Sequence, residues 1–303
     1  MIADRALLEW RRATARLRRV SLGRLVTAHL RTLALHVAAG PRAFTPDRSG
    51  RRERLVVTLT TTPRRARHLG PTLRSLLAQS VAADRIVLAL PAATRRDGTP
   101  YPEPATLNLP AGVEVLACAD EGPATKLLPA LAAEPTAALV VIDDDVIYPS
   151  DFLETLLAAH RAAPSAVVGY RGVELAPGVV FGELTHVFAT AVARPTPVDV
   201  LFGTWGYLVP PGALDGAVAD FSGAPEAVRW VDDVWISGHL ARRGVPRMVV
   251  PAAMYPIETA STLRGSLTGG VNRSGENDRL AVAHFADDWG RTSRGPERET
   301  DGC

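Results

Sequence analysis

A four-residue apolar run that ends in three consecutive aspartates constrains the fold more than any other stretch of this chain. The run, residues 139–142, follows the turn-like residues 134–136 and has no polar interruption, which is typical of a strand covered on both faces in a parallel sheet. Asp143, Asp144 and Asp145 stand where that strand ends. Because ligands of open α/β sheets bind outside the carboxyl ends of the strands, we expect a ligand site here.

The three carboxylates suit a hard cation. Alternate side chains of an extended chain point the same way, so Asp143 and Asp145 are expected to share one face. Two such charges repel each other and shift toward protonation unless a cation lies between them. Oxygen ligands suit Mg²⁺ or Mn²⁺, and Mg²⁺ usually takes one or two carboxylates and completes its shell with substrate phosphates. We therefore predict a metal and diphosphate site, the alternative being an acidic loop that caps a helix beginning near Ser150.

Strands and helices alternate along the rest of the chain. β-Branched and apolar residues predict strands over residues 54–62 and 85–90, with a helix between them that carries four leucines on one side. Strand, helix and strand in this order form a βαβ unit, so the sheet is expected to begin parallel. Further elements are expected as follows: strands at 113–117, 166–170 and 246–256, and a helix at 150–163.

Two longer strands are expected to pair antiparallel, over residues 181–193 and 198–209. Gly203 and Gly206 in the second allow something to approach the backbone closely, and Trp205 between them is expected either to contact a sugar or to be part of the core. The predicted fold class is α/β, with a mostly parallel central sheet flanked by helices and a smaller antiparallel portion.

Composition narrows the class of protein. The 303 residues are 47% hydrophobic, enough to bury a full core, and the net charge of +2 argues against wholesale nucleic-acid binding. Cys118 and Cys303 form no metal-ligand cluster, so a reducing compartment is expected. No run of about 18 uncharged apolar residues occurs, so no membrane-spanning helix is predicted, and a cytoplasmic location is expected.

The first 40 residues form an Arg-rich segment of their own. Eight Arg against Asp4 and Glu9 alternate with leucines, which predicts one or two basic amphipathic helices. Such a helix either lies on an anionic membrane surface, giving peripheral contact at its inner face, or packs on the domain or a partner. Residues 41–53 are expected to be a linker, residues 54–290 a catalytic domain, and residues 291–303 a disordered tail.

Lys126 is the single Lys among the 34 basic residues. It follows a Gly122-Pro123 turn and Thr125, at a place where a helix is expected to start. Free amides at a helix N-terminus and a compact ammonium both suit phosphate, so Lys126 is a candidate for binding phosphate. The alternative is that one Lys has survived by chance at an exposed site.

Asp232 and Asp233 open a predicted helix that ends in basic residues. Acidic residues at a helix start stabilise the helix through its macrodipole, by about 0.5 kcal/mol each. This stabilisation is the simpler explanation for the presence of the two aspartates. Because Trp230 and Trp235 flank the pair, partial desolvation is also expected, and a carboxylate with a raised pKa can take a proton from an acceptor hydroxyl.

The stretch near the end of the chain adds two features. Residues 258–278 are rich in Ser, Thr and Gly and are expected to form a mobile loop that closes over substrate. After it, His284 is either a structural residue or a further metal ligand, since a neutral imidazole is acceptable to Mn²⁺.

These motifs, in this order, resemble the catalytic domain of the GT-A glycosyltransferases, most closely family-2-like and exostosin-like members. The resemblance covers roughly residues 54–290 and depends on four segments taken together: residues 58–63, 122–126, 142–145 and 231–234. It implies a GT-A type fold, a nucleotide-sugar donor with a UDP-sugar favoured, a carbohydrate or other hydroxyl acceptor, and Mn²⁺ or Mg²⁺.

The resemblance also implies roles for individual residues. Thr60, Thr61 and Thr62 border the base. Asp143 and Asp144 face the nucleotide, with Asp143 at the ribose, and Asp145 holds the metal on the diphosphate. On the acceptor side the base is Asp233 or Asp232, with Asp233 preferred. The pair is Asp-Asp where Glu-Asp is frequent among inverting members, which leaves the stereochemical outcome open.

Two other classes fit parts of the sequence. A haloacid-dehalogenase-type phosphatase also has Asp-x-Asp after a strand, but it needs that motif on its first strand, whereas here other strands precede it. A non-catalytic membrane-surface module would use residues 1–40 to bind lipid and its acidic clusters to bind metal only structurally.

Overall fold

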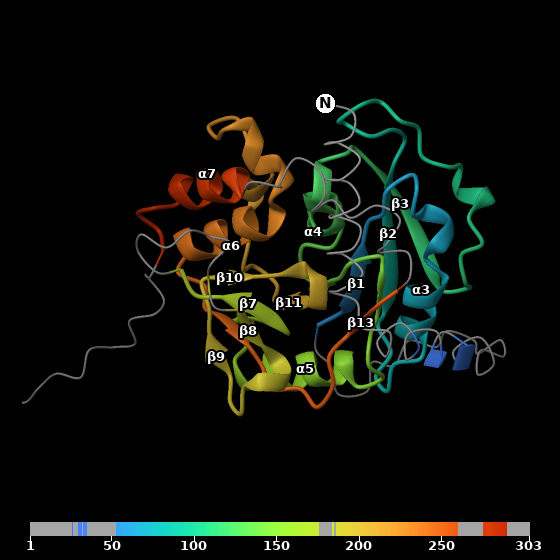
Figure 1. Cartoon of the computed structure of the whole chain (residues 1–303), viewed down its shortest axis with the longest axis horizontal. Coiled ribbons are helices and arrows are strands. Elements are labelled where there is room, and N and C mark those ends of the chain that lie inside the picture. Colours follow the sequence, from blue (N-terminus) through green and yellow to red (C-terminus); the bar gives the residue numbers. More distant parts are fainter. Residues whose placement is uncertain are drawn as a thin grey trace, which may run out of the picture.

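An eight-stranded sheet forms the centre of the structure, a computed structural model that describes residues 53–175, 184, 186–259 and 275–289 and the single positions 26, 30, 31, 33 and 34 (Figure 1). Across the sheet the strands are β3 (Val113–Cys118), β2 (Arg85–Pro91), β1 (Leu55–Leu59), β4 (Ala138–Val141), β11 (Tyr207–Val209), β6 (Val167–Gly169), β12 (Arg247–Val249) and β9 (Thr196–Pro197). The helices are α3 (Gly70–Leu77), α4 (Leu128–Ala133), α5 (Phe152–Ala162), α6 (Asp232–Arg242) and α7 (Glu276–His284). The predicted fold class is confirmed.

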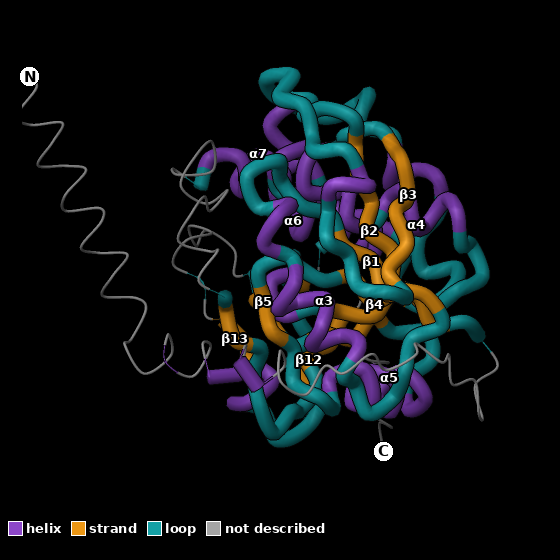
Figure 2. The backbone as a smooth tube through the Cα atoms, turned by 90° about the vertical axis from the view of Figure 1, so that its right-hand side faces the viewer, coloured by secondary structure: helices purple, strands orange, loops and turns teal. Residues whose placement is uncertain are grey.

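The first four strands are parallel and doubly wound. β1 pairs with β2 and with β4, and β2 pairs with β3, all in parallel. The steps from β1 to β2 and from β3 to β4 run in opposite directions across the sheet. Because such crossovers are right-handed, α3 and α4 lie on opposite faces (Figures 1 and 2). The order therefore reverses between β1 and β4, which is where open α/β sheets bind their ligands.

Beyond β4 the sheet becomes mixed. β11 runs antiparallel to both β4 and β6, while β12 runs parallel to β6. A second sheet of three antiparallel strands, β10 (Val200–Leu201), β7 (Arg171–Val173) and β8 (His186–Phe188), lies beside it. A two-stranded sheet joins β13 (Ile257–Glu258) to β5 (Val146–Ile147). These are the smaller antiparallel portions that the sequence predicts.

The prediction of two long paired strands over residues 181–193 and 198–209 is wrong. The second stretch forms β10, then a 3-10 turn, then β11, and these two strands belong to different sheets. The break lies at Gly206, whose φ of 81° disfavours a side chain, and an added Cβ would lie 2.6 Å from the Phe152 ring. The chain thus turns from one sheet into the other where only glycine fits.

Several expected segments lie outside the described residues, namely most of 1–40, the linker up to residue 52, residues 260–274 and the tail from residue 290. Of the N-terminal segment, the five described positions are helical, and the side chains of Val26, Leu30 and Leu33 are exposed. None of the helices described here is long and apolar enough to cross a membrane.

An aromatic cluster joins α6 to α7 and encloses His239. Its ring lies 4.6 Å from that of Trp235 and 5.3 Å from that of Phe285, and its Nε2 atom has no hydrogen-bond partner. Burial, assisted by the charge of Arg242, lowers the pKa of His239 to about 4. The imidazole is therefore neutral in the folded protein at neutral pH.

The buried imidazole predicts acid sensitivity. Between pH 6.5 and 4 the unfolded chain binds a proton at His239 that the folded protein does not, so the free energy of unfolding falls as the pH falls through this window, by up to about 3 kcal/mol. In urea titrations at pH 7 and pH 4.5, His239→Gln should lose less stability on acidification than the wild type. Equal losses in the two proteins would contradict the assignment.

Candidate active site at the carboxyl ends of β1 and β4

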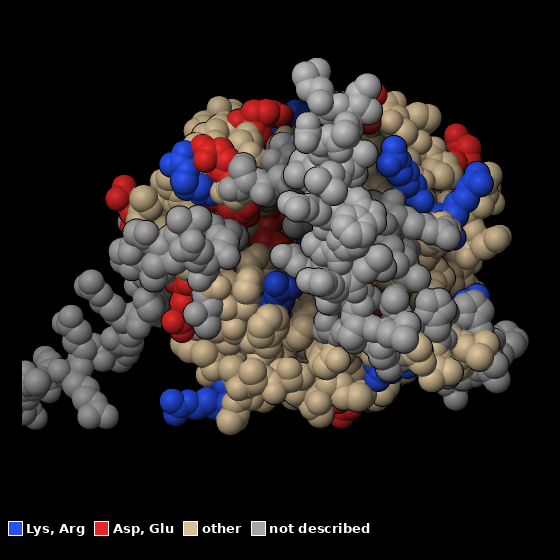
Figure 3. Space-filling view, in the orientation of Figure 1, with Lys and Arg blue, Asp and Glu red and all other residues tan. Residues whose placement is uncertain are grey.

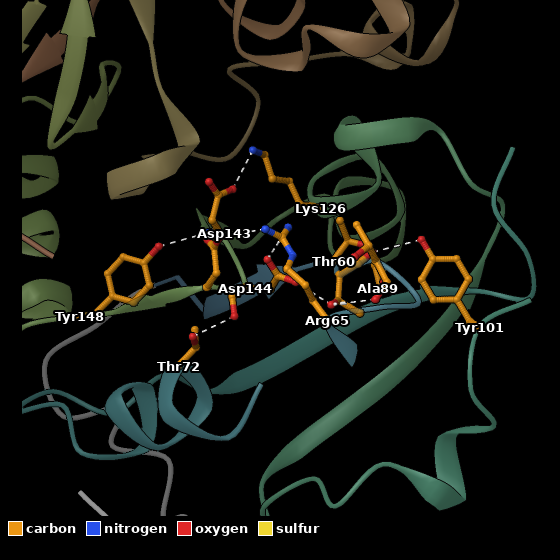
Figure 4. Close-up of polar contacts among 12 residues, drawn as sticks. Thr60, Arg65, Thr72, Ala89, Tyr101, Lys126, Asp143, Asp144 and Tyr148 are labelled. Atoms are coloured by element: carbon orange, nitrogen blue, oxygen red, sulfur yellow. Dashed lines mark hydrogen bonds and ion pairs between the residues drawn. The ribbon is translucent and has the colours of Figure 1, made fainter. Parts of the chain in front are cut away.

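The three aspartates lie at the reversal of strand order, on a turn that is held from both sides. β4 leads into the turn, and β5 leads out of it and pairs with β13, where the Thr259 amide donates to the Asp145 carbonyl at 2.7 Å. On the other side the Asp143 amide donates to the hydroxyl of Tyr148 at 3.1 Å (Figure 4). The carboxylates are thereby fixed outside the end of β4.

Arg65, just after β1, binds two of the three aspartates. Its guanidinium lies 2.7 Å from a carboxylate oxygen of Asp144 and 2.7 Å from one of Asp145. Thr61 donates to the other oxygen of Asp144 at 2.5 Å, and Thr72 of α3 donates to its carbonyl at 2.9 Å. Burial, with the neighbouring charge of Asp145, raises the pKa of Asp144 to about 7 although Arg65 opposes it.

The expectation that Asp143 and Asp145 share one face of an extended chain is wrong. Residues 144 and 145 form a turn, so the alternation of a strand does not apply. Consecutive residues Asp144 and Asp145 both reach Arg65, while Asp143 points to Lys126. The carboxylates remain neighbours, because Asp143 contributes, after burial, to the raised pKa of Asp145.

Lys126 is buried and gathers three carboxylates from two distant parts of the chain. Its Nζ lies 3.0 Å from Asp143, 3.0 Å from Asp232 and 3.8 Å from Asp233. Burial alone would lower the pKa of this ammonium, but the three carboxylates raise it well above its usual value. The single Lys is therefore a charged residue at the centre of the site, and the exposed-survivor alternative is wrong.

The sequence predicts a helix start at Lys126, and this prediction is wrong. Lys126 ends a 3-10 turn, and α4 begins two residues later, so no helix N-terminus carries the site. Likewise, α5 begins after Asp151, and no side chain, including that of Ser150, makes a cap hydrogen bond there. The aspartate turn thus has no part in capping α5.

Gly203 lets the second carboxylate pair approach the Lys. An added Cβ at this position would lie 2.5 Å from the Lys126 Nζ, so only glycine leaves room for the ammonium. The Gly203 amide also donates to Asp233 at 2.9 Å, which orients that carboxylate. The close approach predicted for Gly203 is thus made by a side chain of the protein itself.

Asp233 is the second residue of α6, and its carboxyl group has a raised pKa. Burial, with the adjacent charge of Asp232, raises its pKa to about 7, although Lys126 lowers it. Its side chain is 20% exposed and that of Asp143 is 26% exposed, whereas Asp144 and Asp145 are 1% and 12% exposed. Asp143 and Asp233 are therefore the more exposed of these four carboxylates, and acidic atoms are visible near the centre of the face drawn in Figure 3.

Of the remaining candidates, Thr60 and Thr62 support a loop and Trp205 lies in the core. Thr60 donates to the Ala89 carbonyl at 2.8 Å, and the Thr62 carbonyl accepts the amides of Arg65 and Ala66, so both support the loop that carries Arg65. Trp205 is buried, with its ring 5.1 Å from Phe188 and 5.7 Å from Tyr255.

His284 is not a neighbour of the aspartate turn. Its ring stacks on that of Trp235 at 5.5 Å, within the aromatic cluster of α6 and α7. In the parts of the chain that the structure describes, no three His, Cys, Asp or Glu side chains are arranged to hold a metal ion. The ligand set of Asp143, Asp145 and His284 is therefore wrong as to His284, because aromatic packing holds the imidazole elsewhere.

The carboxylates alone still fit a divalent cation shared with a substrate. Five carboxylates face the two cations Lys126 and Arg65, so negative charges outnumber positive ones by three when all are ionised. Oxygen donors of this kind suit Mg²⁺ or Mn²⁺ held by one or two carboxylates and by phosphate oxygens. Asp143 and Asp145, neighbours on the turn, are the residues that would supply them.

Sequence reasoning missed Arg65 and Tyr148 as parts of this site and did not say what Gly203 would contact. Arg65 gave no signal because almost every basic residue of the chain is Arg, whereas the single Lys stood out. A hint was available in its place just after the threonines that end the first strand. The Tyr148 hydroxyl and the Gly203 amide act through contacts that sequence spacing does not reveal.

Comparisons with known proteins leave the family open. No protein-family model matches the chain, and no curated protein matches it significantly. Among solved structures it is similar to residues 1–349 of S. aureus TarS, with 13% identity and a TM-score of 0.47 over 79% of this chain and 70% of that one. The same S. aureus protein in complex with UDP gives 14% identity and a TM-score of 0.49 over 79% and 68%. Similarity at this level carries no argument about activity, so a function for this chain has to be argued from the side chains of its own site.

Replacing the buried ammonium should destabilise the fold strongly. Lys126→Met leaves Asp143, Asp232 and Asp233 without their cation, and breaking a buried ion pair costs about 3–5 kcal/mol. The measurement is the free energy of unfolding in urea. Arg279→Met, which removes an exposed ion pair with Glu276, should cost less than about 1 kcal/mol. Equal effects of the two changes would show that the cluster around Lys126 is not a structural centre.

Proposed function

We propose that this protein is a GT-A type glycosyltransferase, which transfers a sugar from a nucleotide-diphosphate sugar to an acceptor hydroxyl. The observation that carries the proposal is the meeting of Asp143 and Asp233 at Lys126. One carboxylate comes from the strand end where nucleotides bind in doubly wound sheets, and the other comes from a helix start 90 residues later. A site with donor and acceptor carboxylates side by side suits group transfer between two substrates.

The donor half of the site is the reversal between β1 and β4. A UDP-sugar is our first choice of donor, with the nucleotide near Thr61, Asp143 and Asp144. Asp143 and Asp145 would hold Mn²⁺ or Mg²⁺ on the diphosphate. When bound, that cation neutralises negative charge on the departing nucleoside diphosphate. Lys126 supports this by keeping Asp143 in place and by adding positive charge.

The acceptor half is Asp233 with its surroundings. An acceptor oxygen forms a bond to the anomeric carbon as the bond from that carbon to the diphosphate oxygen breaks, through an oxocarbenium-like transition state. Asp233 takes the hydroxyl proton, for which its pKa near 7 is suited, and the nucleoside diphosphate leaves with the electron pair. This role gives inversion at the anomeric carbon; in a retaining reaction Asp233 orients donor and acceptor instead.

The site favours a transferase over the two other classes. A haloacid-dehalogenase-type phosphatase needs its nucleophilic aspartate after the first strand, but here β4 is the fourth strand along the chain. A non-catalytic module has no need of a carboxylate with a pKa near 7 at a position that substrates can reach.

Donor binding should depend on Asp145. At a UDP concentration of about 100 times the dissociation constant, with Mn²⁺ present, the wild type should gain about 2.7 kcal/mol of stability. Asp145→Asn should lose this gain and remain folded, because Arg65 keeps its contact with Asp144. Thermal unfolding with and without UDP and Mn²⁺ measures the effect. Asp151→Asn serves as the matched control, and a full metal-dependent shift in Asp145→Asn would show that the metal assignment is wrong.

Transfer should depend on Asp233 without affecting donor binding. The donor for the assay is whichever UDP-, GDP- or dTDP-sugar stabilises the wild type most. The assay measures the rate at which the nucleoside diphosphate is released. Asp233→Asn should lower the rate by about 10²–10⁴-fold, the usual contribution of a general base, and keep the thermal shift with donor. Release of the diphosphate at the wild-type rate by Asp233→Asn would show that Asp233 takes no part in the reaction.

A further inference from the structure

Arg171 is a cation beside the active site that none of the roles above uses. It is the first residue of β7, and its guanidinium carbon lies 5.4 Å from the centre of the Phe188 ring and 5.2 Å from that of Phe202. Aromatic rings at this distance attract a cation and fix its position, but they do not neutralise its charge.

The guanidinium has no polar partner among the residues that the structure describes. It forms no ion pair or side-chain hydrogen bond there, and its buried Nε atom is unsatisfied. An unsatisfied buried donor costs about 1–3 kcal/mol, so native structures rarely keep one without a ligand or function. Burial lowers the pKa of Arg171, and the charges that oppose this are those of Asp233, Glu258 and Asp143. The group therefore lies near the carboxylates of the active site and outside ion-pair distance of them.

The backbone ties Arg171 to the acceptor carboxylate. The Phe202 amide donates to the Arg171 carbonyl at 2.9 Å, and the next amide, that of Gly203, donates to Asp233 at 2.9 Å. Arg171 is thus hydrogen-bonded to Phe202, the residue just before the glycine that orients the proposed base. It belongs to the sheet of β10, β7 and β8, whereas the proposed donor half lies between β1 and β4.

An aromatic wall continues from this cation. The Phe188 ring packs on Trp205, which stacks on Tyr255, and the side chain of Tyr255 is 36% exposed. Aromatic surfaces with one well-placed polar group are typical of small-molecule sites, where the polar group selects the ligand. Here that group is a guanidinium, whose paired N–H groups match phosphate and carboxylate oxygens.

We propose that Arg171 binds an anionic group, a phosphate or a carboxylate, carried by the acceptor, and so holds the acceptor hydroxyl beside Asp233. The acceptor role rests on the proposed function, whereas the anion site itself is tested without donor or metal. A neutral sugar of the same shape binds far more weakly, because it leaves the half-buried guanidinium unpaired.

The test compares three probes on the full chain: glucose, glucose 6-phosphate and glucuronate, each titrated in thermal unfolding. Glucose 6-phosphate or glucuronate, or both, should stabilise the wild type, and glucose should not; which of the two acts tells phosphate from carboxylate. Arg171→Gln should weaken binding of the charged sugar at least tenfold. Arg171→Lys, which keeps the charge but not the paired donors, should weaken it less, and it takes the place of Arg171→Gln if that variant fails to fold. Arg161→Gln, at an exposed position on α5, should bind as the wild type.

Several results would overturn the proposal. One is the absence of any response to both charged sugars, and another is a response that survives in Arg171→Gln. A third is a loss in Arg171→Gln of the shift produced by UDP and Mn²⁺ without any effect on charged sugars, since the guanidinium would then serve the donor. If charged sugars bind through Arg171 but no nucleotide stabilises the protein, the anion site is supported while the transferase and the acceptor role both fail.

Discussion

A buried ammonium surrounded by carboxylates holds the functional half of this protein together. Lys126 lies within 3.8 Å of Asp143, Asp232 and Asp233, which belong to elements far apart in the sequence. Removing any one of these charges from water is costly, and together they are stable only because each neutralises another. The end of β4 and the start of α6 are therefore held in one arrangement, and the glycine at position 203 is required for it because a side chain there would displace the Lys.

A second cation completes the arrangement. Arg65 binds Asp144 and Asp145, so two carboxylates are engaged on the side of β1 and three on the side of α6. Carboxylates outnumber the two cations here, and the raised pKa values near 7 of Asp144 and Asp233 have their main cause in burial. Charges that are fixed before a substrate arrives need no reorganisation during the reaction, which is the main way in which active sites stabilise developing charge. Arg171, in the three-stranded sheet, adds a cation beside aromatic rings that hold it without neutralising it.

The local elements could be predicted because they depend on neighbours in the sequence. The buried runs at β1, β2 and β4 contain few polar residues, and their order with the intervening helices determines a parallel start to the sheet. Prediction failed where a tertiary contact overrides local pattern. Residues 198–209 are apolar enough for one strand, but Gly206 divides them between two sheets. His284 has the chemistry of a ligand, but the ring of Trp235 holds it away from the aspartates.

By itself the sequence determined the class of fold and the strand end that carries the aspartates, and it marked the one Lys as a candidate, since periodicity, strand endings and an isolated residue type are all visible in one dimension. Only the tertiary structure decided which carboxylates share a cation, which of them are exposed, and which of many arginines pairs with the aspartate turn. The physical reason is that ion pairing and burial depend on distances between residues 17 to 107 positions apart in the chain, and an arginine in solvent has the same letter as one held against a buried carboxylate.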